Sequence, residues 1–377
     1  MTGAPSALHW QPADDPGGRR FARLLDDGDD RGWLESGGPL PGLTVAYETW
    51  GTLDASRGNA VLVLHALTGD SHATGSPDGH DPTPGWWDEL IGPGRAIDTD
   101  RFFVVSPNVL GGCQGTTGPS SPAPDGRAWG ARFPRITIRD QVSAEVLLAD
   151  HLGIDRWAAV VGGSMGGMRV LEWCVGHPDR VARAAVLAVG AAATADQVAL
   201  CSVQCRAVRL DPAYLGGDYY GSGAAPVAGM ALARGIGQIT YRTGVEFEER
   251  FGRSPQRDED PLAGGRYAVE SYLQYQGEKL AARFDPNSYV VLSEAMNSHD
   301  VGRGRGGVPA ALSRVTADVR VAGIDTDRLY PLALQAELAD LLPGDHPLTV
   351  IRSRFGHDGF LLESEQAGAV VARALGT

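Results

Sequence analysis

The chain has 377 residues, 43% of them hydrophobic, and a formal net charge of −13 at pH 7. This composition is that of an ordinary folded protein, and the length allows one large core with an inserted or appended part. No clustered basic stretch is present, which argues against a nucleic-acid binder. The first residues lack a basic region followed by an apolar run, so we expect a cytoplasmic protein without a secretory signal.

The four cysteines form no CxxC pair and have no histidines at metal-binding spacing. We therefore expect reduced, buried thiols and no metal site. The longest apolar stretch, 184–195, is interrupted by Gly190 and is too short to cross a bilayer.

Residues 1–40 are polar and rich in Gly, Pro and Asp, and they indicate an irregular N-terminal arm. From Leu43 the sequence LTVAYETWG alternates, which predicts a half-exposed strand. Continuous apolar runs at 59–67 and 102–112 predict strands buried on both faces of a parallel sheet. The segment 140–152 has the periodicity of an amphipathic helix.

A strand is predicted at 156–164, followed by a sharp turn, a helix that Pro178 ends, and a further strand at 184–190. Alternating strands and helices require right-handed crossovers, so the fold class expected is α/β with a mostly parallel sheet and helices on both faces.

The alternation stops near residue 195 and resumes with strands at 318–324 and 348–353, each followed by a helix. Between these stretches the sequence is helical and shows no buried strand. We therefore predict an inserted helical subdomain in a single α/β domain, and not two sequential domains. The predicted division is a core of 1–195 and 308–377 and an inserted helical lid of 196–307.

The sequence GGSMGG at 162–167 fits the pattern G-x-S-x-G and lies between a predicted buried strand and a helix. This is the context of a nucleophile elbow, in which a strained turn holds the serine hydroxyl clear of the sheet. The expected fold is therefore the α/β-hydrolase fold, with Ser164 as the nucleophile. A glycine-rich turn that only packs a helix on a strand would not need a serine.

A serine hydroxyl needs a base, and in this fold the partners follow in the order serine, acid, histidine. His357 best meets this requirement, because it follows the last predicted strand in the glycine-flanked loop FGHDGF. The other histidines precede Ser164, lie at the far end of the elbow helix, or fall in the insertion or at a strand's start. They are His9, His65, His72, His80, His151, His177, His299 and His346.

The acid is expected after the strand at 318–324, where Asp325 and Asp327 both qualify by position. The acid would fix the imidazole tautomer and stabilise the imidazolium. For the oxyanion hole, the backbone N–H groups of Leu67 and Met165 are the candidates. Leu67 lies in the loop after an early strand, and Met165 follows the nucleophile directly.

Six blocks of sequence carry a wider resemblance: HALTGDSH, GWWDELIGPGRAIDTDRFFVVSPNVLGGCQGTTGPSS, GGSMGGMRVLEW, RGIGQITYR, TDRLYP and FGHDGFLLE. Together these blocks resemble the homoserine O-acetyltransferase family, and the similarity runs from about residue 42 to the C-terminus. The first 40 residues and the loop at 303–305 depart from the family pattern, and neither carries predicted chemistry.

The resemblance implies a ping-pong reaction in which acetyl-CoA acetylates Ser164 and the L-homoserine hydroxyl, deprotonated by His357, then accepts the acetyl group. The product would be O-acetyl-L-homoserine for methionine biosynthesis. Acetyl-CoA would be a co-substrate, and no permanently bound cofactor is expected. The family pattern also assigns Asp327 as the triad acid.

The resemblance further implies that Arg234 pairs with the homoserine carboxylate, that Tyr241 lies nearby, and that Asp358 holds the ammonium group. A guanidinium suits this role, because it can grip a carboxylate through two parallel hydrogen bonds. The family is homodimeric, and its helical insertion forms a lid and a tunnel for the pantetheine arm.

Three alternatives remain open. A relative could use succinyl-CoA or acetylate serine, because a few pocket side chains decide both choices. A plain esterase would hydrolyse acetyl esters without acceleration by homoserine. A scaffold protein of the same fold would work equally well after Ser164→Ala.

Overall fold

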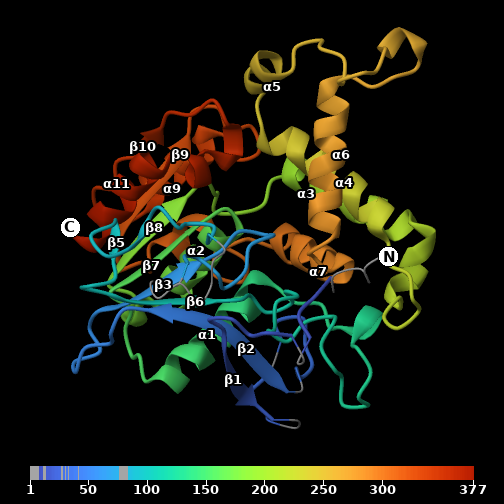
Figure 1. Cartoon of the computed structure of the whole chain (residues 1–377). Helices are drawn as coiled ribbons and strands as arrows, with labels where there is room; N and C mark the ends of the chain where they lie inside the picture. Colours follow the sequence, from blue (N-terminus) through green and yellow to red (C-terminus); the bar gives the residue numbers. More distant parts are fainter. Residues whose placement is uncertain are drawn as a thin grey trace.

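The computed structural model describes residues 8–11, 14–26, 29, 31–32, 34–40, 42–75 and 84–377. Its centre is an eight-stranded sheet with the order β1-β2-β6-β3-β7-β8-β9-β10 (Figure 1). The strands are β1 (Arg20–Leu25), β2 (Leu43–Trp50), β3 (Ala60–Leu64), β6 (Phe103–Pro107), β7 (Ala159–Gly163), β8 (Arg183–Leu187), β9 (Asp318–Ile324) and β10 (Thr349–Ile351). Two short strands, β4 (Ile91–Gly92) and β5 (Ile97–Asp98), pair separately.

All pairings from β6 to β10 are parallel, and only β2 runs antiparallel to both of its neighbours. Side chains of β3 alternate between two hydrophobic clusters, with Leu62 in one and Val63 in the other. Helices α1 (Ile138–Leu152) and α2 (Met165–Gly176) bury side chains in the first cluster, and α11 (Ser364–Leu375) in the second. The predicted mostly parallel sheet with helices on both faces is confirmed.

The prediction of an irregular arm over 1–40 is wrong for residues 20–25, which form the edge strand β1. This strand pairs antiparallel with β2 and buries Ala22 and Leu25. The strand was not predicted because it has only six residues, lies among Gly, Pro and Asp residues, and pairs with a strand about twenty residues later in the sequence. The strand β2, which lies between β1 and β6, is also more buried than its alternating sequence suggests.

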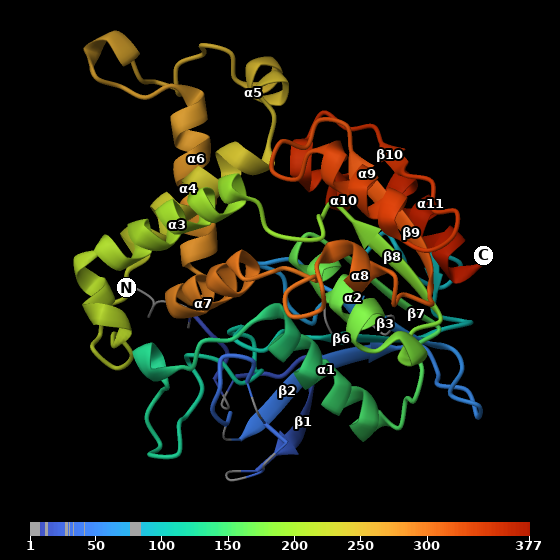
Figure 2. The same cartoon turned by 180° about the vertical axis from the view of Figure 1, so that it is seen from behind.

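Most of the helices between β8 and β9 form a group to one side of the sheet, which Figure 2 shows from behind, whereas the short helix at 308–312 lies apart from this group, next to α2 in that view. Within the described residues no strand of the large sheet lies between β8 and β9. The helices are α3 (Ala195–Leu210), α4 (Val227–Tyr241), α5 (Gly244–Arg250), α6 (Ala268–Ala281), α7 (Pro286–Asn297) and α8 (Val308–Leu312). The remaining helices are α9 (Leu332–Leu341), α10 (Gly359–Leu362) and the short turns η1 (Gly130–Arg132), η2 (Pro178–Arg180), η3 (Pro212–Gly217), η4 (Pro261–Ala263) and η5 (Gly356–Asp358).

The C-terminal end of α4 lies against the loop that follows β10. The Thr243 hydroxyl donates a hydrogen bond to the Arg354 carbonyl oxygen at 2.6 Å. A Cβ at Gly356, whose φ is 64°, would lie 2.6 Å from the Tyr241 carbonyl oxygen. The close approach requires glycine there, and it brings the helical group to the carboxyl end of the sheet. In the part of the chain that the structure describes, no helix is both long and apolar enough to cross a membrane.

Candidate active site

Ser164 lies at the tight turn between β7 and α2. Its backbone has φ 56° and ψ −125°, a strained conformation for a residue with a side chain. A Cβ at Gly166 would lie 2.0 Å from the Leu64 carbonyl oxygen, and one at Gly162 would lie 2.8 Å from the Gly166 carbonyl carbon. The two glycines of the G-x-S-x-G pattern are therefore required for the turn that presents the serine.

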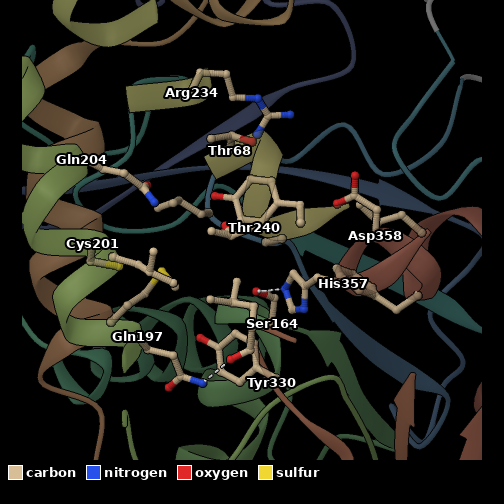
Figure 3. A pocket seen from close by; sticks show the side chains of 18 residues that line it. Thr68, Ser164, Gln197, Cys201, Gln204, Arg234, Thr240, Tyr330, His357 and Asp358 are labelled. Atoms are coloured by element: carbon tan, nitrogen blue, oxygen red, sulfur yellow. Dashed lines mark hydrogen bonds between the residues drawn. The ribbon is translucent and has the colours of Figure 1, made fainter. Parts of the chain in front are cut away.

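Ser164, His357 and Asp327 form a continuous chain of hydrogen bonds. His357 Nε2 lies 2.8 Å from Ser164 Oγ (Figure 3), and His357 Nδ1 lies 2.6 Å from Asp327 Oδ2. All three side chains are buried, and they come from the end of β7, the loop after β9 and η5 after β10. The structure thus brings Ser164 together with Asp327, which is 163 positions later in the sequence, and with His357, which is 30 positions after Asp327.

The two candidate acids face different partners. Asp327 Oδ1 accepts hydrogen bonds from the backbone N–H groups of Leu329 at 2.8 Å and Tyr330 at 2.9 Å, which leaves Oδ2 for His357. Asp325 accepts a hydrogen bond from the Ser353 N–H at 3.0 Å and lies 3.3 Å from Arg352. Asp327 is therefore the carboxylate in contact with the imidazole.

The surroundings of His357 strengthen it as a base. Burial alone would lower its pKa, but the charge and hydrogen bond of Asp327, with the charge of Asp358, outweigh this and raise the pKa. The Tyr330 ring stacks on the imidazole, with centroids 5.0 Å apart and planes 27° apart. This arrangement can remove the proton from the Ser164 hydroxyl as it attacks a carbonyl group.

The candidate oxyanion donors border the nucleophile. Leu67 lines the same pocket as Ser164, and Met165 is the first residue of α2. Neither backbone N–H donates a hydrogen bond to another group among the residues that the structure describes. Both N–H groups are therefore free to receive an oxyanion, and their role stays a prediction.

A buried polar network that sequence reasoning missed supports the loop before Leu67. Arg169, on α2, donates a hydrogen bond to the His65 carbonyl oxygen at 2.5 Å and pairs with Glu145, on α1, at 2.6 Å. His65 Nε2 accepts a hydrogen bond from the Val109 N–H at 3.0 Å. Burial and the Arg169 charge lower the pKa of His65 to about 3, so the ring stays neutral. Its Nε2 can therefore accept the hydrogen bond from the Val109 N–H, which helps to fix the loop.

The Ser164 side chain opens into a pocket of about 150 Å³. Figure 3 shows Arg234 and Gln204 at its upper end and Ser164 with His357 below. The lining residues are Ala66, Leu67, Thr68, Ser164, Gln197, Leu200, Cys201, Gln204, Arg234, Thr240, Tyr241, Met296, Leu329, Tyr330, His357, Asp358, Phe360 and Leu361. Among the described residues, no group of three His, Cys, Asp or Glu side chains is placed to hold a metal ion.

The three residues expected to bind the acceptor all line this pocket. The Arg234 guanidinium lies 5.3 Å from the centre of the Tyr241 ring. Asp358 Oδ2 lies 3.0 Å from Arg242 Nε, a partner that the sequence did not predict although it directly follows Tyr241. Burial raises the pKa of Asp358, and the charges of Arg242 and Arg234 oppose this only in part.

Comparison with known proteins agrees with this geometry. A family model described as alpha/beta hydrolase fold matches residues 59–364, which confirms the expected fold class. A curated relative from Thermobifida fusca, named homoserine O-acetyltransferase, is 59% identical over 372 residues, covering 98% of this chain and 97% of the relative. The chain belongs to the homoserine O-acetyltransferase family.

The solved structures that are similar to this chain include an acyltransferase and an esterase. The homoserine O-acetyltransferase from Bacillus anthracis has a TM-score of 0.87 and 28% identity, with 95% of this chain and 97% of that chain covered. An esterase, E22, has a TM-score of 0.85 and 27% identity, with 95% and 99% covered. The scaffold is therefore shared by transferases and hydrolases.

Proposed function

We propose that this protein transfers an acetyl group from acetyl-CoA to the hydroxyl of L-homoserine, giving O-acetyl-L-homoserine for methionine biosynthesis. The observation that carries the proposal is the buried Ser164–His357–Asp327 chain, which opens into a pocket that also contains Arg234 and Asp358. The high identity to relatives named homoserine O-acetyltransferase supports this choice of substrates.

In the proposed first half-reaction, Ser164 Oγ attacks the thioester carbonyl while His357 Nε2 takes the hydroxyl proton. The N–H groups of Leu67 and Met165 stabilise the oxyanion of the tetrahedral intermediate. The C–S bond then breaks, and His357 gives its proton to the departing CoA thiolate. Asp327 keeps the imidazole in the correct tautomer and stabilises the imidazolium in both halves.

In the second half-reaction, His357 takes the proton of the homoserine hydroxyl, which attacks the acetyl-Ser164 carbonyl. The ester bond to Ser164 breaks, and the proton returns to Ser164 Oγ. Arg234 binds the acceptor carboxylate beside Tyr241, and Asp358, which already pairs with Arg242, binds the ammonium group. Holding the acceptor at both ends supplies the high effective concentration needed to compete with water.

The function is tested by incubating the protein with each pairing of acetyl-CoA or succinyl-CoA with L-homoserine or L-serine and measuring the products by mass spectrometry. O-acetyl-L-homoserine is expected to form much faster than any other product. Faster formation of a succinyl ester or of an O-acylserine would assign a different donor or acceptor.

A plain esterase is the second candidate, because an esterase shares the fold with a TM-score of 0.85. In that case L-homoserine would leave the rate of p-nitrophenyl acetate turnover unchanged. The proposed transferase should instead release p-nitrophenol faster when L-homoserine is added, and the acetyl group should appear on homoserine.

Replacing Arg234 with glutamine is expected to raise KM for L-homoserine roughly 100-fold, since hydrogen bonds to a charged group contribute about 1.5–3 kcal/mol. The rate of enzyme acetylation by acetyl-CoA should change little. Steady-state kinetics for both substrates measure this split. Arg206→Gln, at an exposed position on α3, is the matched control and should leave both constants unchanged.

We also propose that helices α3 to α7, in the segment 196–307, form a lid and that two copies of the chain associate through it. Several large apolar side chains on these helices are exposed, a pattern that marks interaction surfaces when such residues gather. They include Val203, Leu210, Leu215, Val227, Leu232, Ile239, Val245 and Tyr275.

Leu232, on α4, is 59% exposed, and Leu232→Asp should weaken association because it places a charge in an apolar contact. Light scattering should give a dimer for the wild type and a smaller mass for the variant at micromolar concentration. A monomeric wild type would contradict the proposed dimer.

A further inference from the structure

Gln204 presents an amide to the pocket from the inner face of α3. Together with Gln197, Leu200 and Cys201 it forms a stripe at helical spacing along the pocket wall. Its side chain is buried, with the residue only 4% exposed. Figure 3 shows its amide end pointing from the helix into the pocket.

The two glutamines of this stripe differ in what they bind. Gln197 uses both ends of its amide: Nε2 donates to the Leu329 carbonyl oxygen at 2.7 Å, and Oε1 accepts from the Thr194 N–H at 2.9 Å. Gln204 Oε1 accepts a hydrogen bond from the Tyr289 hydroxyl at 2.5 Å. Its Nε2 has no acceptor among the residues that the structure describes, so this largely buried side chain leaves one donor facing the pocket.

This free donor lies at the end of the pocket that contains Arg234. Tyr289, which holds the Gln204 amide, lies near enough to Arg234 for the guanidinium charge to oppose the rise in the Tyr289 pKa that burial causes. Within the described part of the chain, Arg234 lies over the Tyr241 ring and forms no ion pair, although its charge acts on Asp358 from farther away. An unpaired cation and an unpaired amide donor together match the oxygens of one bound carboxylate.

We propose that the Gln204 side-chain amide, oriented by Tyr289, donates a hydrogen bond to the acceptor carboxylate that Arg234 binds. Gln204 is thus a second carboxylate-binding residue, and Tyr289 is a positioning residue behind it. The inference rests on the proposed function, because it takes the acceptor to be an amino acid.

The test compares wild type and Gln204→Met with two acceptors, L-homoserine and 3-aminopropan-1-ol, which lacks the carboxylate. Methionine keeps the length of the side chain and removes the donor. KM for L-homoserine should rise roughly tenfold, while the rate of enzyme acetylation by acetyl-CoA should change less than about twofold. With 3-aminopropan-1-ol, wild type and variant should have the same kcat/KM. Gln274→Met, an exposed glutamine on α6, is the matched control.

Two further variants separate carboxylate binding by Gln204 from the positioning of its amide by Tyr289. Gln204→Glu places a carboxylate opposite the acceptor carboxylate, so it should raise KM for L-homoserine more than Gln204→Met does. Tyr289→Phe keeps the amide but releases it from its anchor, and its increase in KM should be smaller than that of Gln204→Met. A Gln204→Glu variant that binds homoserine better than Gln204→Met would overturn the proposal, since the amide oxygen would then be facing the ammonium group.

Other results would also overturn it. An increase in KM for acetyl-CoA in Gln204→Met would indicate that the Gln204 amide binds the pantetheine arm of acetyl-CoA and not the acceptor carboxylate. Equal losses with both acceptors would give Gln204 a merely structural role. If wild type makes O-acetyl-L-homoserine and Gln204→Met keeps its KM for L-homoserine, only this inference fails. If wild type makes none, the proposed function fails and this inference with it.

Discussion

Ser164→Ala is expected to lower kcat for acetyl transfer about a millionfold, the size of effect that removal of a triad nucleophile produces. The reason is geometric, because Ser164 Oγ is the atom that the elbow presents to His357 Nε2 at 2.8 Å. The backbone turn is formed by glycines and not by the serine hydroxyl, so the variant should fold normally.

The loss is measured by quantifying O-acetyl-L-homoserine over time with acetyl-CoA and L-homoserine in excess. Ser143→Ala, which removes an exposed hydroxyl on α1, is the matched control and should retain full activity. A Ser164→Ala variant with more than a small fraction of wild-type activity would exclude Ser164 as the nucleophile.

Asp327→Asn is expected to lower kcat roughly 10⁴-fold, because an amide at this position holds the imidazole in the wrong tautomer. Asp327 Oδ2 lies 2.6 Å from His357 Nδ1, whereas Asp325, two residues earlier, contacts the Ser353 N–H. Asp325→Asn is therefore a closely matched control and should reduce kcat only slightly. Comparable losses in the two variants would contradict the assignment of the acid.

The pH dependence of Asp327→Asn provides a second measurement. The base must be neutral to accept a proton, so kcat/KM falls as pH drops below the His357 pKa. Asp327 raises that pKa in the wild type, against the lowering effect of burial. In Asp327→Asn the acid limb should therefore move to lower pH. An unchanged or higher acid limb would show that Asp327 does not set the His357 pKa.

The parts of the site that local sequence determines could be predicted. The elbow needs glycines within two residues of Ser164, and the pattern is visible in the sequence because the residues that form the turn are consecutive, although Gly162 and Gly166 also approach the Leu64 carbonyl oxygen. His357 could be found from chain order and its glycine-flanked loop. Position in the sequence did not show whether Asp325 or Asp327 is the triad acid. The direction in which each carboxylate points depends on hydrogen bonds that form only in the folded loop, from the Ser353 N–H to Asp325 and from the Leu329 N–H to Asp327.

The parts that depend on distant contacts could not be predicted. Arg169 and Glu145 are ionisable side chains at buried positions, and their pairing with each other, with the hydrogen bonds to the His65 carbonyl oxygen and from Trp173, accounts for this burial. The role proposed for Gln204 depends on its hydrogen bond with Tyr289, which is 85 residues away on another helix. The strand β1 was missed for a related reason, since only its pairing with β2 distinguishes it from the polar segment around it.

Intact-mass measurement after rapid mixing with acetyl-CoA tests the central claim most directly. The wild type should gain one acetyl group, Ser164→Ala should gain none, and added L-homoserine should remove the acetyl group while O-acetyl-L-homoserine forms in equal amount. Acetylation of Ser164→Ala to the wild-type extent, or transfer to homoserine by that variant, would contradict an acetyl-Ser164 intermediate.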